Sequence, residues 1–126
     1  MTLFDECKNA LDADFSLVEG LRERQAMDIL KEYPFHSGSI EWSKICFTDY
    51  DVFDDVFSKK EIINNMVFVF TDDSSIPIFR SNLNLIAENI YDVTALSPKL
   101  FIFNNEIIIQ PLFPTEIFRF GTKVDS

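Results

Sequence analysis

The chain of 126 residues has the size of one domain, and 47% of its residues are hydrophobic, including 14 Phe. This composition excludes intrinsic disorder, and a chain of this length can bury about two-thirds of its unfolded surface without a disulfide or a metal ion. The formal net charge of −10 excludes ordinary binding to nucleic acid or to anionic membranes, because phosphate contacts require Lys and Arg.

The first third of the chain predicts two helices. Thr2 and Asp5 have the spacing of a capping box at the start of the first helix. The second helix is expected over about residues 21–33 and ends before Pro34. Its apolar face consists of Ala26, Ile29, Leu30 and Tyr33. The N-terminal sequence lacks a basic region followed by an apolar stretch, so we expect no signal peptide and a cytoplasmic protein.

Residues 40–64 predict a strand followed by a helix. The strand is expected over Ile40–Phe47, with a bulge at Ser43-Lys44 where the alternation of apolar residues changes parity. The helix is expected to begin at Asp49 or Asp51 and to run to about Asn64. Its inward-facing residues are Val52, Phe53, Val56 and Phe57.

The next segment predicts two strands and the clearest helix of the chain. Met66–Thr71 is apolar on both faces and is typical of a buried central strand. After a turn at residues 72–75, Ile76–Arg80 is expected as an edge strand, because Pro77 cannot donate a backbone hydrogen bond. The helix begins at Ser81 or Asn82. Its apolar face consists of Leu83, Ile86, Ala87, Ile90, Val93 and Leu96.

Residues 99–112 predict a hairpin in the middle of the sheet. A two-residue turn at Asn104-Asn105 would pair Phe103 with Glu106 and Ile102 with Ile107. Because side chains alternate between the faces of a strand, the hairpin has one aliphatic face and one mixed face. The aliphatic face consists of Leu100, Ile102, Ile107 and Ile109. The mixed face consists of Lys99, Phe101, Phe103, Glu106, Ile108 and Gln110. A further short strand or a tail is expected over Glu116–Lys123.

These elements predict one α+β domain over residues 1–126. The domain has a mainly antiparallel sheet, a central hairpin at about 99–112, and three to four helices packed mostly on one face.

Catalytic and metal-binding signatures are missing from the sequence, and we expect neither an enzyme nor a cofactor. His36 is the only histidine and lacks a companion nucleophile motif. Cys7 and Cys46 lack CxxC spacing and are expected to be buried, reduced thiols. An EF-hand that begins at Asp49 fails, because Lys60 stands where the bidentate Glu belongs.

The negative charge is concentrated in the first half of the chain. Residues 1–55 contain 13 Asp and Glu against five Lys and Arg, whereas residues 56–126 contain eight against six. An acidic face of this kind either keeps the protein soluble or steers a basic partner. If it binds a partner, the aromatic residues near it are candidate anchors. The candidate partner-binding residues are Glu41, Trp42, Asp49, Tyr50, Asp51, Asp54, Asp55, Asp72 and Asp73.

Two stretches of the chain resemble a known family. They are MTLFDECKNALDADFS at residues 1–16 and PIFRSNLNLIAENIYDVTALSPKLFIFNNEIIIQPLFPTEIFRFG at residues 77–121. They resemble immunity proteins of bacterial contact-dependent growth inhibition systems, especially those paired with ribonuclease toxins. The resemblance implies a monomer that forms a 1:1 complex with the basic nuclease domain of a cognate toxin. It also implies that the acidic surface blocks the active site of that toxin, without direct contact to nucleic acid or membrane.

An acidic type III secretion chaperone is the alternative function. Such chaperones are also small, acidic α/β proteins, and they bind an unfolded segment of an effector as dimers. Size and charge fit both classes. The oligomeric state and the neighbouring gene would separate them.

Overall fold

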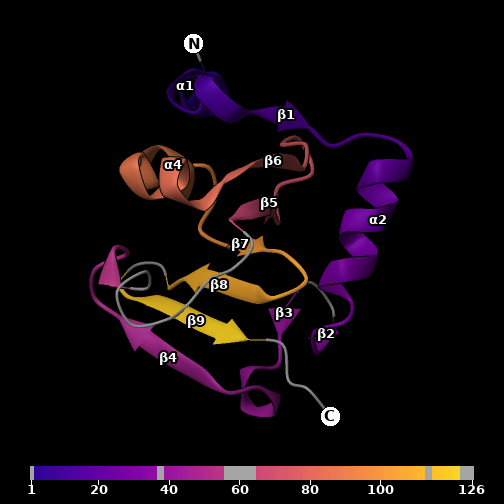
Figure 1. Ribbon diagram of the computed structural model, residues 1–126, viewed down its shortest axis with the longest axis vertical. Helices are drawn as coiled ribbons and strands as arrows, with labels where there is room; N and C mark the ends of the chain where they lie inside the picture. Colours follow the sequence, from indigo (N-terminus) through magenta and orange to yellow (C-terminus); the bar gives the residue numbers. More distant parts are fainter. Residues whose placement is uncertain (1, 37–38, 56–64, 113–114, 123–126) are drawn as a thin grey trace.

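The computed structural model describes residues 2–36, 39–55, 65–112 and 115–122. Within this part of the chain, seven strands form one antiparallel sheet in the order β1-β6-β5-β7-β8-β9-β4, and β2 and β3 form a separate hairpin (Figure 1). The strands are β1 Ser16–Leu17, β2 Phe35–His36, β3 Ser39–Ile40, β4 Phe47–Tyr50, β5 Met66–Thr71, β6 Phe79–Asn82, β7 Leu100–Phe103, β8 Ile107–Pro111 and β9 Phe118–Thr122. The predicted α+β class is confirmed.

Helices cover both faces of the sheet, but unequally. The α-helices of the described chain are α1 Leu3–Ala10, α2 Leu21–Leu30, α4 Leu83–Glu88 and α5 Ile90–Thr94. Buried residues of α1, α4 and α5 belong to one core cluster, whereas those of α2 belong to the other. Figure 1 shows α2 well apart from α1 and α4. The prediction that helices pack mostly on one face is therefore confirmed.

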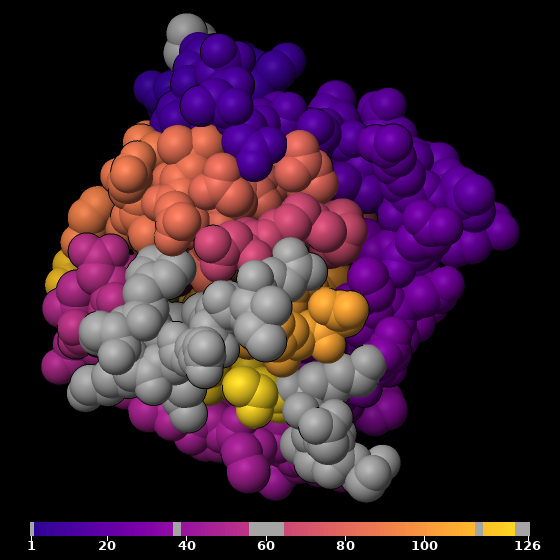
Figure 2. All heavy atoms as spheres, viewed as in Figure 1, coloured from indigo at the N-terminus to yellow at the C-terminus, as the bar shows by residue number. Residues whose placement is uncertain are grey.

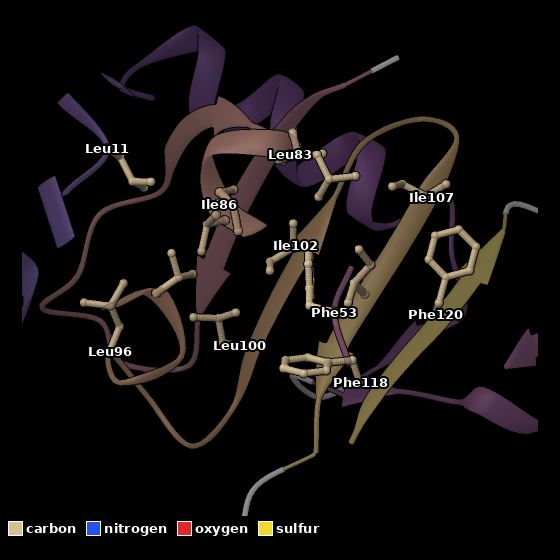
Figure 3. Close-up of a cluster of buried hydrophobic side chains, with 14 of the residues drawn as sticks. Leu11, Phe53, Leu83, Ile86, Leu96, Leu100, Ile102, Ile107, Phe118 and Phe120 are labelled. Atoms are coloured by element: carbon tan, nitrogen blue, oxygen red, sulfur yellow. The ribbon is translucent and has the colours of Figure 1, made fainter. Parts of the chain in front are cut away.

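The central hairpin separates the two cores as the alternation of its side chains predicts. Its aliphatic residues lie in the core beneath α1, α4 and α5, where Figure 3 shows Leu100, Ile102 and Ile107 beside Leu83 and Ile86. The opposite core contains the aromatic and β-branched residues of the same strands, namely Phe101, Phe103 and Ile108. Burial of both faces explains why β7 and β8 lie in the middle of the sheet.

The pairing within this hairpin differs from the prediction by two residues. Ile102 pairs with Ile109 and Phe103 with Ile108, whereas a turn at Asn104-Asn105 would pair Ile102 with Ile107. A shift of two residues keeps every side chain on its predicted face, because the period of a strand is two. The predicted faces are therefore right and the predicted register is wrong.

Asn104 explains the shifted turn. Its Oδ1 accepts hydrogen bonds from the backbone N–H groups of Glu106 and Ile107, at 2.7 and 2.9 Å. Its Nδ2 donates to the carbonyl oxygen of Met66 at 2.9 Å, and its own carbonyl oxygen accepts from the hydroxyl of Tyr33 at 2.8 Å. Asn104 is 1% exposed. The side chain therefore closes the loop from inside the fold and moves the tip of the turn to Asn105-Glu106.

The helices predicted at the N-terminus, over about residues 21–33 and after Asn82 form, the second as α2 and the third with one interruption. The Thr2 side chain and the Asp5 side chain make the capping box of α1, and this contact lowers the pKa of Asp5. The Asn82 side chain caps α4, as expected, by accepting from Leu85 N–H at 2.8 Å. The helix expected to run to Leu96 is interrupted at Asn89, which separates α4 from α5. The Asn89 Nδ2 donates a hydrogen bond to the carbonyl oxygen of Leu85.

The structure corrects three predicted elements. β4 occupies the beginning of the expected helix at 49–64, and residues 56–64 lie outside the described part. The expected strand over 40–47 is replaced by β3, a 3₁₀ helix at Trp42–Lys44, and the first residue of β4. β6 is not an edge strand, because β1 pairs with its outer side and Pro77 precedes the ladder.

The two cysteines differ in their burial. Cys7 is buried, and burial raises its pKa to about 12, so its thiol stays protonated. Cys46 is exposed, which corrects the expectation that both thiols are buried. None of the helices in the described ranges combines the length and the apolar character that crossing a bilayer requires.

Candidate functional site

A cavity of about 550 Å³ opens on the side of the sheet that α5 covers. Its walls come from the turn at 51–54, from α5, from the segment 97–100 that precedes and begins β7, and from residues 115–118 at the start of β9. Figure 2 shows atoms of the segment around 50–55 (magenta) directly next to those of the α5 region (orange), at the left of the molecule. Segments that are distant in sequence therefore build one site.

In the turn after β4, the side chain of Phe53 is buried, whereas those of Asp51 and Asp54 are exposed. Phe53 is 4% exposed and packs edge to face against Phe118, with ring centroids 5.3 Å apart. Figure 3 shows Phe53 and Phe118 close to Leu100, which also lines the cavity. Asp51 and Asp54 are exposed at its margin. The buried Phe53 thus fixes the turn, and the turn presents the two carboxylates.

Helix α5 places a large exposed aromatic residue at the same cavity. Val93 of α5 is fully buried, whereas Tyr91 is 73% exposed. Val52, which also lines the cavity, is 52% exposed. Large apolar and aromatic side chains that stay exposed beside a cavity are typical of protein interfaces.

The described residues that line the cavity carry negative charge only. Asp51, Asp54 and Glu116 line it, and no Lys, Arg or His is among the described residues that do so. Within the described chain, these three side chains form no ion pair and no hydrogen bond. Three carboxylates at one cavity create a local attraction for cations.

The other predicted site residues are distributed around this end of the molecule and along β4. Asp55 follows the cavity turn and is half-buried. Asp72 and Asp73 are exposed at the end of β5, which is the same end of the sheet as Asp51, since β5 and β4 both finish there. Asp73 accepts hydrogen bonds from the N–H and hydroxyl groups of Ser75, and these lower its pKa.

Asp49 is engaged within the fold. Its two oxygens accept from Nε and an Nη of Arg119 at 2.9 and 3.1 Å. This contact raises the pKa of Arg119. The guanidinium lies 4.2 Å from the ring centroid of Phe47, so an aromatic face and a carboxylate hold the same cation.

Trp42, Glu41 and Tyr50 also have contacts inside the molecule. The indole N–H of Trp42 donates to Gln110 at 2.7 Å, and its ring lies so close to Gly121 that a Cβ there would be 2.8 Å from it. Glu41 forms an exposed ion pair with Lys44 at 3.3 Å. Tyr50 is 5% exposed and packs against Phe120. These three residues do not line the cavity.

Tyr91 and Glu116 line the cavity but are not among the residues that the sequence predicted. The helical spacing that turns Ile90 and Val93 inward implies that Tyr91 faces outward, so the exposure of Tyr91 could have been predicted from the sequence. Glu116 lies in an irregular segment without periodicity, and its proximity to Asp51 arises only from the pairing of β4 with β9.

The residues of the cavity suit the binding of a partner. Among the described residues, no group of three His, Cys, Asp or Glu side chains is placed to hold a metal ion. The cavity offers apolar walls, exposed aromatic and aliphatic side chains at its margin, and carboxylates. Such a surface suits a positively charged protein partner.

Comparison with known proteins identifies the family. The family model of the CdiI immunity protein, EcoliA0-like, matches residues 1–121, which is nearly the whole chain. Among curated proteins, none matches the chain. The chain belongs to the CdiI immunity protein family and is a toxin-neutralising immunity protein of contact-dependent growth inhibition.

Proposed function

We propose that this immunity protein neutralises its toxin by binding the toxin's basic nuclease domain through the acidic cavity and its margin. The observation that carries the proposal is the group of carboxylates Asp51, Asp54 and Glu116, which have no partner among the described residues, beside the exposed Val52 and Tyr91. Nuclease domains hold phosphate groups with basic residues. An acidic inhibitor can occupy the same groove and exclude the RNA substrate.

The nuclease is proposed to be a ribonuclease, as the sequence resemblance implies. The inhibitor acts by occlusion in the cytoplasm, as a monomer in a 1:1 complex, and performs no reaction itself. Asp55, Asp72 and Asp73 extend the acidic surface from the cavity. Glu41, Trp42 and Asp49 form a second part of the proposed surface along β4, where their contacts to Lys44, Gln110 and Arg119 hold them in place.

Co-expression with the toxin domain encoded by the adjacent gene tests this function. We expect cells that produce both proteins to survive with intact RNA, and cells that produce the toxin domain alone to stop growing. A catalytically inactivated toxin domain supplies the binding measurement. Its affinity should fall steeply between about 0.05 and 0.5 M salt, because exposed charge pairs are screened at high ionic strength.

Two results would contradict the proposal. Cells that die despite abundant folded immunity protein would exclude neutralisation of this toxin. Survival with an affinity that does not depend on salt would exclude the acidic surface as the means of binding.

A further inference from the structure

We propose that the cavity receives an arginine or lysine side chain from a loop of the toxin domain, and that this one basic residue anchors the complex. The inference rests on the proposed function and names the chemical group that the acidic surface recognises.

The walls suit the stem of a long basic side chain. Leu100 and Phe118 belong to the buried core and also line the cavity, and Ala87 and Ile90 complete this apolar part. Lys and Arg side chains bury their methylene stems along apolar surface while their charged ends stay near polar groups. The volume of about 550 Å³ also leaves room for the backbone of the loop that carries the side chain.

The charge of the cavity selects a cation as its occupant. Asp51, Asp54 and Glu116 have no partner among the described residues, and no basic side chain of the described chain lines the cavity. A purely apolar occupant would remove these carboxylates from water without a compensating contact, which is unfavourable. A guanidinium or ammonium group would satisfy them with charge-assisted hydrogen bonds.

The margin of the cavity has the features of an anchor site. Val52 and Tyr91 both line the cavity and are 52% and 73% exposed. On binding they would exclude water from the charged contact, which is the role of residues around an interface hot spot. The ring of Tyr91 also offers an aromatic face to a cation.

Filling the cavity tests the proposal. Ala95 is exposed and lines the cavity, so Ala95→Tyr would obstruct it without changing the core. Gln25→Tyr is the matched control, because Gln25 is exposed and lines a different cavity beside α2. We expect Ala95→Tyr to weaken binding of the inactivated toxin domain by about 30-fold or more and Gln25→Tyr by less than about threefold. Circular dichroism and melting temperature should match the wild type for both variants.

Two charge-removal variants distinguish binding by the cavity carboxylates from attraction by the overall negative charge of the protein. The variant Asp51→Asn, Asp54→Asn, Glu116→Gln removes the cavity carboxylates at nearly constant shape. The variant Asp12→Asn, Glu23→Gln, Asp28→Asn removes the same charge from exposed positions elsewhere. The first should lose about 30-fold or more in affinity and the second less than about threefold.

A small probe tests the cavity without the toxin. n-Butylguanidinium should produce saturable NMR shifts at the methyl groups of Val52, Ile90 and Leu100, whereas butyrate should not. Absence of these shifts overturns the inference, as does unchanged toxin affinity in Ala95→Tyr. If the toxin domain binds the wild type and Ala95→Tyr equally, the proposed function stands and only the anchor fails. If it does not bind the wild type, the proposed function itself fails.

Discussion

Two cavities on opposite faces of the sheet have opposite charge. The cavity beside α5 is lined by Asp51, Asp54 and Glu116, without a described basic residue. The second, of about 390 Å³ beside β1 and α2, is lined by Arg22 and Arg80, without a described carboxylate. A net charge of −10 is therefore not spread evenly, and charge alone does not identify the binding surface.

The carboxylates near the two cavities also differ in what they contact. At the β1 edge, Asp14 accepts from Arg80 at 2.9 Å and from Asn82 at 3.0 Å. The hydrogen bond from Asn82, followed by that from Arg80, lowers the pKa of Asp14. This carboxylate joins the loop after α1 to β6. Among the described residues, the cavity carboxylates have no such partner.

The largest expected effect is on toxin binding. Asp51→Lys with Asp54→Lys should weaken binding of the inactivated toxin domain by about 100-fold or more, because close charge pairs at interfaces couple by ~1.5–7 kcal/mol. Unfolding in urea should change by less than about 0.5 kcal/mol, since both residues are exposed.

The matched control for this variant is Asp12→Lys with Asp28→Lys, which makes the same change in charge at exposed positions away from the cavity. Calorimetric titration of both variants makes the comparison. Equal losses of affinity in the two would show that net charge, and not the cavity, determines binding.

A smaller effect, on stability, is expected at the other edge. Asn82→Ala removes both the cap of α4 and a donor to Asp14, and loss of a cap costs about 1–2 kcal/mol. The free energy of unfolding measures this cost. Asn82→Ser keeps an acceptor for the cap and should recover most of the loss. Toxin affinity should not change in either variant, and a large loss of affinity would mean that this edge also binds.

The smallest effect is expected in the acid dependence of stability. The folded pKa of Asp14 is lowered, so its contribution is fully present above its unfolded pKa of about 3.9 and is lost as the pH falls through the folded value. Urea midpoints between about pH 5 and pH 3 should therefore fall more steeply for the wild type than for Asp14→Asn. Parallel curves would mean that the contacts of Asp14 do not stabilise the fold.

Local periodicity predicted much of the fold. The capping box at Thr2 and Asp5, strand Met66–Thr71 and the two faces of the central hairpin depend on neighbouring residues, and all of them form. The exact pairing of the hairpin was not predictable in this way, because it depends on contacts of Asn104 with Met66 and Tyr33.

Nonlocal pairing accounts for the errors at β4. The spacing of Val52, Phe53, Val56 and Phe57 suits a helix. Asp49, where that helix was expected to begin, instead pairs with Arg119, 70 residues away, and the strand follows from that ladder. The cavity also depends on residues that are far apart in the sequence. Asp51 and Asp54 could be chosen from the sequence, whereas the position of Glu116 beside them depends on the pairing of β4 with β9.

Hydrogen–deuterium exchange of the complex with the inactivated toxin domain tests the central claim most directly. We predict that binding slows exchange in the turn at 51–54, in α5 and in residues 115–118, and leaves β1 and α2 unchanged. Protection of β1 and α2, with none around the acidic cavity, would contradict the account.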